Sequence, residues 1–398
     1  MKKIFEICLY LFFILTRTIN ILDLPIFNDE AFFLFAGNKI LGDPGQNLFF
    51  NFSDGKEPLF FWVYSLVNIF PDPLLALRLI SVFFGLLTFI YFRKITPNFF
   101  ASVFFVFSPF LLFYQRLGMQ ESLLVFLLTA ATYYAFKNKY LMGGLFAGLS
   151  LLTKTTAFAY LIPLFIFKFN PKTIIVTLGV YLPFFFGLQS VLGHNSAYAG
   201  AIPPSQMVTN FKMSLRWLWE YQGPIGLLGV FTPPVIIENL IAKIFFPRYF
   251  LFVVPGLIIA ATYLINRLRP KVIKSAIFLV LLVPNIILSL QIITNVKSAN
   301  LPYIEKWQYL EAWPAGYGIK ETAGYLRSQN LKMIITEDIM ITRYGLNYYY
   351  PELKVEPYKK QKEGVFVFKR SKELVNDLGF EKIYNSYDVS VYRSRPGT

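Results

Sequence analysis

Residues 2–22 read KKIFEICLYLFFILTRTINIL: two lysines precede the apolar run Ile4–Leu22. A helix needs about 20 mainly apolar residues to cross the hydrocarbon core of a bilayer. The run contains Arg17, is longer than the core of a secretory signal and is followed by no small-residue cleavage site. It therefore predicts a retained membrane-spanning helix and not a cleaved signal peptide.

The composition of the whole chain extends this prediction. The 398 residues are 55% hydrophobic and only 15% charged, whereas an average soluble domain carries roughly 25% charged residues. The mean hydropathy of +0.50 excludes a disordered or coiled-coil protein. Further apolar runs lie at about 74–92, 98–114, 121–136, 140–153, 155–167, 173–192, 225–246, 249–266 and 275–294. The sequence predicts a polytopic α-helical membrane protein with about 9–10 membrane segments.

Short basic clusters between the runs predict the topology. Twelve basic residues and no acid lie in the clusters Lys2/Lys3, Arg93/Lys94, Lys137/Lys139, Lys168/Lys172 and Arg267/Arg269/Lys271/Lys274. By the positive-inside rule these mark the cytoplasmic side, so the N-terminus is expected there and the tail after residue 295 outside. The stretch 225–246 must then enter and leave on the outside, which predicts nine true spans and one irregular element around Thr232-Pro233-Pro234.

The last hundred residues have a different composition. Residues 295–398 contain 16 basic and 12 acidic residues, against 22 and 11 in residues 1–294. Alternating patterns predict strands at Lys332–Thr336, Gly364–Lys369 and Asp388–Arg393, and helices at Ile319–Gln329 and Ser371–Leu378. We therefore expect a transmembrane domain at 1–294 and a small extracytoplasmic α/β domain at 295–398.

Rare residue types limit the chemistry. The chain has one cysteine, Cys8, and one histidine, His194, which excludes a disulfide framework and a multi-histidine zinc site. A pI near 9.6 would suit nucleic acid, but the basic residues lie mostly between apolar runs. Acid–base chemistry must therefore come from carboxylates.

The carboxylates before residue 295 gather in one outward loop, 23–72. Seven of the eleven lie there: Asp23, Asp29, Glu30, Asp43, Asp54, Glu57 and Asp72. Two short aromatic-rich helices are predicted in this loop, Ala31–Leu41 with Asn28 as its N-cap, and Leu59–Phe70 after Pro58. Helices too short to span lie along the membrane surface and would hold the loop carboxylates at the water boundary.

Each charged residue also has a purely structural interpretation. Acids in a first helical turn are favoured by the helix dipole, which applies to Asp29, Glu30 and Glu121. The Lys56 side chain would lie along apolar surface with its charge in water, and Arg248 would anchor a helix end at the membrane interface. Lys154 would occupy a bend between two spans, and His194 would be a polar loop residue.

Several short motifs resemble one family when taken in order. They are Pro25-x-x-x-Asp29-Glu30-Ala31, Lys56-Glu57-Pro58-Leu59-x-x-Trp62, Leu77-Arg78-Leu79-Ile80-Ser81, Arg116-x-Gly118-Met119-x-Glu121, Gly144-Leu-x-x-Gly148-Leu149-x-Leu-Leu152-Thr153-Lys154 and Phe246-Pro247-Arg248-Tyr249-x-Leu251-x-x-x-Pro255. This set resembles the protein O-mannosyltransferase and aminoarabinose-transferase group, the family 39 type of the C-superfamily (GT-C) of membrane glycosyltransferases. The resemblance covers residues 10–160 best.

The sequence departs from the family pattern in places. Position 57 is Glu where many relatives have Pro, and the second acidic site is Glu instead of Asp. The stretch 195–247 is short of at least one helix pair. The tail segment from Tyr309 to Gly318 resembles extensions of some bacterial relatives but suggests no chemistry.

The resemblance implies a polyprenyl-phosphate-sugar donor and inverting transfer to an acceptor hydroxyl of a protein, lipid or glycan at the outer face of the cell membrane. Asp29 would take the acceptor proton, Glu30 would position the loop or acceptor, and Glu121 would be the second carboxylate across the cavity. Cations would stabilise the leaving phosphate. The lipid-phosphate-binding candidates are Lys56, Arg248 with its neighbour Tyr249, Arg116 and Arg78.

Other possibilities stay open at this level. Glu57 and His194 would be the ligands of a divalent metal if one is used, so the metal site is unknown and no cofactor is certain. A multi-span transporter or flippase would also have many spans and charges at membrane edges. A non-catalytic relative acting as a binding partner is the third class.

Overall fold

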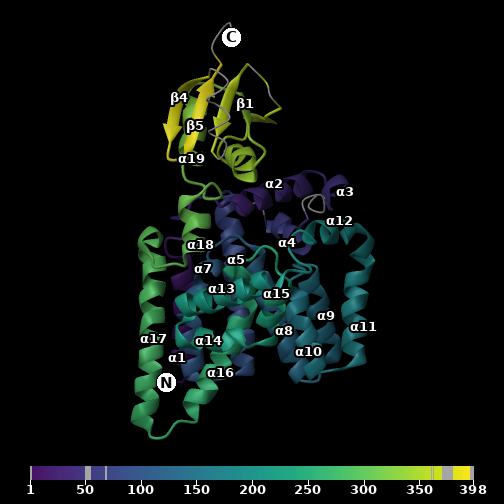
Figure 1. Cartoon of the computed structure of the whole chain (residues 1–398), viewed down its shortest axis with the longest axis vertical. Helices are drawn as coiled ribbons and strands as arrows, with labels where there is room; N and C mark the ends of the chain where they lie inside the picture. Colours follow the sequence, from purple (N-terminus) through teal and green to yellow (C-terminus); the bar gives the residue numbers. More distant parts are fainter. Residues whose placement is uncertain are drawn as a thin grey trace.

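The computed structural model describes residues 2–49, 55–67, 70–359, 361, 363–369 and 380–394. A bundle of helices carries a small sheet at one end (Figure 1). The start of α1 (Lys2–Thr18) and the connection between α16 (Val254–Asn266) and α17 (Lys271–Thr294) lie at the opposite end of the bundle (Figure 1). This architecture confirms the predicted fold class, a helical membrane protein with a small C-terminal α/β unit.

Three helices among the described residues are long and apolar enough to cross a membrane. They are α5 (Pro73–Ile95), the continuous segment Pro247–Asn266 formed by η3 (Pro247–Val253) and α16 (Val254–Asn266), and α17 (Lys271–Thr294). The count rises to five if each bent helix pair is one span. Nine crossings therefore stay a prediction.

Shorter helices complete the bundle. They are α1 (Lys2–Thr18), α6 (Phe99–Val106), α7 (Pro109–Gln115), α8 (Gln120–Phe136), α9 (Tyr140–Leu151), α10 (Ala157–Phe167), α11 (Pro171–Tyr181), η2 (Leu182–Phe184), α12 (Phe185–Asn195), α13 (Pro204–Gln222), α14 (Pro224–Val230) and α15 (Pro233–Ile241). The irregular element expected at 225–246 is present, because α14 and α15 meet at 66°. The long amphipathic helix α13 lies where the sequence predicted only a loop.

The predicted run 98–114 is broken into α6 and α7. The Ser108 hydroxyl caps α7 by accepting a hydrogen bond from the Leu111 N–H, at 3.4 Å, and Pro109 takes the first helical position. Proline there needs no N–H and favours a new helix start. The break places Tyr114 and the turn after α7 at the sheet-bearing end of the bundle.

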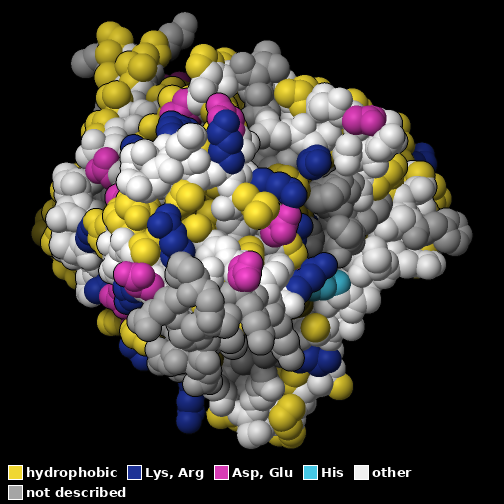
Figure 2. Space-filling view, turned by 90° about the horizontal axis from the view of Figure 1, so that it is seen from above, with side chains coloured by type: hydrophobic (Ala, Val, Ile, Leu, Met, Phe, Trp, Pro, Cys, Tyr) yellow, Lys and Arg dark blue, Asp and Glu magenta, His cyan; other side chains and the backbone are white. Residues whose placement is uncertain are grey.

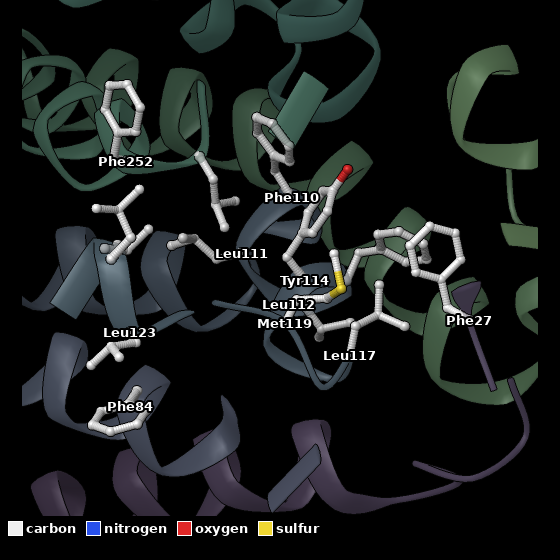
Figure 3. Close-up of a cluster of buried hydrophobic side chains, with 14 of the residues drawn as sticks. Phe27, Phe84, Phe110, Leu111, Leu112, Tyr114, Leu117, Met119, Leu123 and Phe252 are labelled. Atoms are coloured by element: carbon white, nitrogen blue, oxygen red, sulfur yellow. The ribbon is translucent and has the colours of Figure 1, made fainter. Parts of the chain in front are cut away.

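The core of the bundle supports this turn. Phe110, Leu111, Leu112 and Tyr114 of α7 belong to one buried cluster with Leu117, Met119 and Leu123 of the next segment and with Phe27 (Figure 3). All eight side chains are buried. Because interiors are close-packed, residues flanking this cluster have little freedom to shift.

Two short surface helices cover the sheet-bearing end of the bundle. They are α2 (Asn28–Gly42), continued by α3 (Pro44–Asn47), and α4 (Leu59–Val67). Both helices predicted in this loop are thus found, the second up to Val67, since residues 68–69 lie outside the described part, and their position along the membrane surface stays a prediction. Phe33 of α2 packs edge-on against Phe60 of α4, with ring centroids 4.8 Å apart.

The tail contains a five-stranded sheet in the order β2-β1-β3-β5-β4. Its elements are η4 (Val296–Ser298), α18 (Tyr303–Lys306), η5 (Trp307–Glu311), α19 (Ile319–Ser328), β1 (Met333–Thr336), η6 (Ile341–Gly345), α20 (Leu346–Tyr349), β2 (Lys354–Pro357), β3 (Val365–Phe368), β4 (Glu381–Ser386) and β5 (Val389–Arg393). β1 pairs in parallel with β2 and β3, and β5 pairs antiparallel with β3 and β4.

Most predicted tail elements are confirmed. The three expected strands are β1, β3 and β5, and the expected helix 319–329 is α19. Strands β2 and β4 were missed because they are half exposed and charged, without the alternation that predicts a strand. The predicted helix Ser371–Leu378 lies outside the described residues.

Candidate functional site

Helix α2 presents two adjacent carboxylates in different directions. Its N-cap is Phe27, whose backbone N–H donates to Glu30 at 2.9 Å. The prediction of Asn28 as N-cap is therefore wrong: Asn28 is the first helical residue, and its side-chain oxygen accepts from the N–H of Ile341 in the tail, at 3.0 Å. Successive helical residues are about 100° apart around the axis, so Asp29 faces a cavity while Glu30 faces the core.

Asp29 lies between two cations from distant segments. Its Oδ1 is 3.7 Å from the Lys56 Nζ, and its Oδ2 is 3.6 Å from the Arg248 Nη1. Burial alone would raise the pKa of the Asp29 carboxyl, but the charges of Lys56, Arg248 and Lys154 hold that pKa below its ordinary value. The carboxyl is therefore ionised at neutral pH.

Glu121 forms the second carboxylate of the cluster. Its Oε1 accepts from the Lys154 Nζ at 2.7 Å and is 3.9 Å from the Arg248 Nε. The Glu121 side chain is only 2% exposed, against 15% for Asp29. Arg248 thus joins both carboxylates, and the more accessible of them is Asp29.

The segment that carries Lys56 is fixed by its neighbours. Gly55 adopts φ +68°, a left-handed conformation that favours glycine, and a Cβ there would come within 2.3 Å of the His194 ring. The Glu57 carboxylate accepts from the Thr155 N–H at 2.7 Å. Burial raises the pKa of the Glu57 carboxyl. Glu57 therefore ties the Lys56 segment to the bend that carries Lys154.

These side chains line one cavity of about 590 Å³. Seen from the sheet-bearing end, basic and acidic side chains lie next to one another around a hollow in the surface (Figure 2). The charged cluster in its lining consists of Asp29, Lys56, Glu121, Lys154 and Arg248. Beside that cluster lie Gln120, Glu57, His194, Glu238 and Tyr249. The tail contributes Trp307, Gln308, Trp313, Pro314, Asp338, Ile339 and Met340.

The structure brings together most of the sequence-predicted site residues. Asp29, Glu121, Lys56, Arg248 and Tyr249 all line the cavity. The Tyr249 ring lies under the Lys154 ammonium, with 4.9 Å between the Nζ and the ring centroid. Such cation–π contact helps to hold the lysine over the cavity.

Glu30 and Arg78 lie elsewhere, fully buried and paired with each other. The Arg78 Nε and Nη2 donate to the two Glu30 oxygens at 2.8 and 2.7 Å, and the Gly118 N–H donates to Glu30 at 2.7 Å. The remaining Arg78 contacts are the carbonyl oxygens of Ile21, Leu24 and Pro25. The expectation of a phosphate contact for Arg78 is therefore corrected, whereas Glu30 lies where it can position the loop, as expected: the pair holds the loop before Asp29.

Arg116 is also directed away from the cavity. Its guanidinium donates to the carbonyl oxygens of Thr16, Ile19 and Asn20, at 2.6–3.0 Å. These carbonyls belong to the end of α1 and the turn after it, where a cation offsets the negative end of the helix dipole. Arg116 therefore stabilises the end of the first helix, which corrects its assignment to the lipid phosphate.

Glu57 and His194, the two candidate metal ligands, both line the cavity. Within the described part of the chain, no group of three or more His, Cys, Asp or Glu side chains is arranged to hold an ion. Metal use stays a prediction.

Sequence reasoning missed two parts of the site. Lys154 was interpreted as a bend residue, although it stands at the end of the Gly144–Lys154 motif and pairs with Glu121. The tail residues that line the cavity gave only one signal, the aromatic stretch Trp307–Trp313 next to the last span. A side chain's approach from a distant part of the chain depends on tertiary packing, which periodicity does not show.

Comparison with known proteins identifies the fold. No family model and no curated protein matches the sequence. Among solved structures, the chain is similar to crystal structures of ArnT from Cupriavidus metallidurans, one bound to undecaprenyl phosphate and one in the apo state. The TM-score is 0.58 for both, with 11% and 10% sequence identity, and the alignments cover 99% and 98% of this chain and 98% of each ArnT chain. The chain therefore shares the fold of ArnT over nearly its whole length.

Proposed function

We propose that this protein is an integral-membrane glycosyltransferase of the family 39 type. It transfers a sugar from a polyprenyl-phosphate-linked donor to an acceptor hydroxyl at the outer membrane face, with inversion. The observation that carries the proposal is the charged cluster: two carboxylates and three cations from five separate segments meet in one cavity. The similarity to ArnT, crystallised with undecaprenyl phosphate, supports a polyprenyl-phosphate partner.

In the proposed reaction Asp29 is the general base. It takes the proton of the acceptor hydroxyl as the oxygen attacks the anomeric carbon, and the bond from that carbon to the phosphate oxygen breaks. The bonding electrons leave with the polyprenyl phosphate. Lys56 and Arg248 stabilise the charge that develops on the phosphate. Glu121 is a positioning residue, because its buried carboxylate holds Lys154 and faces Arg248.

Lys56 provides a direct test of the donor site. A charged contact to phosphate contributes roughly 1.5–3 kcal/mol, which corresponds to about 10- to 100-fold in affinity. Lys56→Ala should weaken binding of a radiolabelled polyprenyl-phosphate sugar by that factor in purified protein. Lys39→Ala is the matched control, because Lys39 is exposed on α2 and does not line the cavity. Equal donor affinity in both variants would show that Lys56 does not bind the donor phosphate.

Asp29 tests the chemical step. Asp29→Asn should lower transfer about 10²- to 10⁴-fold, while its thermal midpoint stays close to that of the unchanged protein. Normal transfer by Asp29→Asn would eliminate the proposed base. Absence of transfer by the unchanged protein would instead favour the transporter or non-catalytic alternatives, since neither forms a glycosidic bond.

The domain division and the orientation are part of the proposal. We place a transmembrane glycosyltransferase domain at 1–294 and an extracytoplasmic α/β domain at 295–398, with a cytoplasmic N-terminus. Cys8 is the chain's one cysteine, so a Cys8→Ser background allows single labelling sites. A cysteine at exposed Ser328 should react with an impermeant maleimide on intact cells, and one at exposed Lys139 should not. The reverse pattern would overturn the orientation.

A further inference from the structure

The cavity has a second wall that the charged cluster does not explain. The tail wall, as we call it, consists of Trp307, Gln308, Trp313, Pro314, Asp338, Ile339 and Met340. These residues come from the π-helical turn η5, the loop after it and the turn that follows β1. The tail therefore completes the cavity.

The tail wall is attached directly to the residues next to Asp29. The Asn28 N–H donates to the Pro314 carbonyl oxygen at 3.0 Å, and the Asn28 side chain accepts from the Ile341 N–H. The rings of Phe27 and Tyr309 lie 4.3 Å apart, and the Tyr309 hydroxyl is 3.5 Å from the Arg248 Nη1. A molecule held on the tail wall is thus held in register with Asp29.

Two amides that line the cavity each have a buried oxygen atom without a hydrogen-bond partner among the described residues. Gln308 of the tail wall is 4% exposed and Gln120 of α8 is 7% exposed. Among the described residues, the Oε1 atom of each accepts no hydrogen bond. A buried polar atom without a partner is costly, so such groups usually meet a ligand or water. An amide both donates and accepts, which matches the hydroxyl group of a ligand.

The aromatic side chains and the charge of the tail wall narrow the class of ligand further. Trp307 and Trp313 are half-buried at the cavity, and indole rings stack on the C–H face of pyranose sugars. Of the described residues on the tail wall, Asp338 is the one with a charge, so this wall offers no cation to a phosphate group. The cations of the cluster, Lys56, Lys154 and Arg248, lie in other segments, which suits a donor phosphate there.

The backbone of the tail wall is unsuited to an extended peptide. Peptides bound in extended form add to a sheet edge through main-chain hydrogen bonds. None of the described residues on the tail wall belongs to one of the five strands.

We infer that the tail wall is the acceptor subsite and that the acceptor is a neutral saccharide, held by the indoles of Trp307 and Trp313 and the amides of Gln308 and Gln120. This inference rests on the proposed function and names its acceptor class. The saccharide hydroxyl that faces Asp29 is the one that attacks the donor sugar. The source of the saccharide is a free glycan or a lipid-linked glycan, which share this chemistry.

A glycan array tests the inference without turnover. Fluorescently labelled full-length protein in detergent is applied to neutral oligosaccharides in free and lipid-linked form, phosphorylated oligosaccharides, and peptides rich in Ser and Thr. Binding to at least one neutral saccharide is expected, with a loss of tenfold or more in Gln308→Ala and in Trp313→Ala. Trp219→Ala is the matched control, because this tryptophan is exposed on α13 and does not line the cavity.

Each result decides the question. The inference is overturned if no neutral saccharide binds, if only phosphorylated glycans or peptides bind, or if both variants bind as the unchanged protein does. Binding of the polyprenyl-phosphate sugar is measured on the same samples. Donor binding that is normal in Gln308→Ala and Trp313→Ala supports an acceptor role, whereas a matching loss of donor affinity assigns the wall to the donor sugar and overturns the inference. If the unchanged protein binds the donor but no glycan, this inference fails and the proposed function stands. If it binds neither, the proposed function fails.

Discussion

Exchange of Glu30 for glutamine should destabilise the protein, whereas the same exchange at the adjacent Asp29 should not. Glu30 and Arg78 are fully buried, and four donors converge on the Glu30 carboxylate: two from Arg78, one from Phe27 and one from Gly118. Glutamine keeps the shape but leaves the Arg78 charge buried and unneutralised. Breaking a buried ion pair in this way costs roughly 3–5 kcal/mol.

The expected loss can be measured as a thermal midpoint. With an unfolding entropy of about 2.1 cal/mol/K per residue, a loss of about 4 kcal/mol lowers the midpoint of a chain this long by on the order of 5 °C. The assay is tryptophan fluorescence during heating in detergent, for Glu30→Gln, Asp29→Asn and the unchanged protein. A Glu30→Gln midpoint within 1 °C of the unchanged protein, together with lost transfer, would refute the structural role and return Glu30 to the reaction.

Two further predictions concern the contacts between tail and bundle. Burial raises the pKa of Glu305 to about 7, against the hydrogen bond from Tyr114 and the charge of Arg248. A carboxyl that binds its proton more tightly when folded contributes stability at pH 4.5 that is lost as the pH rises to about 7, on the order of 3 kcal/mol. Glu305→Gln should flatten this dependence in pH-dependent melting curves, and an unchanged slope would contradict the assignment. Gly316→Ala should lower both stability and transfer, because its Cβ would meet the Ile26 carbonyl oxygen at 1.9 Å. In contrast, Gly324→Ala meets nothing within 4 Å and should stabilise α19 by about 0.4–1 kcal/mol. Equal melting of the two alanine variants would show that the Ile26 contact is not tight.

The parts of the molecule that the sequence predicts are those with local causes. Apolar runs and Pro or Ser helix starts depend on neighbours in the chain, so α2, α4 and α5 were expected at nearly their observed bounds. The breaks are harder to foresee. The division of 98–114 at Ser108-Pro109 has a turn signal, yet the hydrophobic run continues through it.

The same difference between local causes and tertiary packing applies to the residues of the candidate site. Asp29 and Lys56 could be singled out because acids are rare in the first 294 residues and because their motifs follow in order. Arg78 and Arg116 belong to the same motifs, but whether an arginine faces a cavity or caps buried carbonyls is decided by packing. Gln308 has no sequence signal at all, because a lone glutamine in a polar tail becomes unusual only when it is buried without a partner.

In the proposed reaction, the charge balance of the cluster would connect binding of the donor to the strength of Asp29 as a base. Lys56, Lys154 and Arg248 face the carboxylates of Asp29 and Glu121, which leaves one positive charge in excess. A phosphodiester donor carries one negative charge and would neutralise the cluster. It would also draw Lys56 and Arg248, the cations that now lower the pKa of Asp29, toward the phosphate. The Asp29 carboxylate would then become a stronger base only when the donor is present, so that in the proposed reaction the acceptor proton would be taken only when a leaving group is in place. In consequence Asp29→Asn, which removes a negative charge beside the phosphate site, should bind the donor at least as tightly as the unchanged protein while transferring sugar about 10²- to 10⁴-fold more slowly. An Asp29→Asn protein with the weak donor binding expected of Lys56→Ala would break this connection.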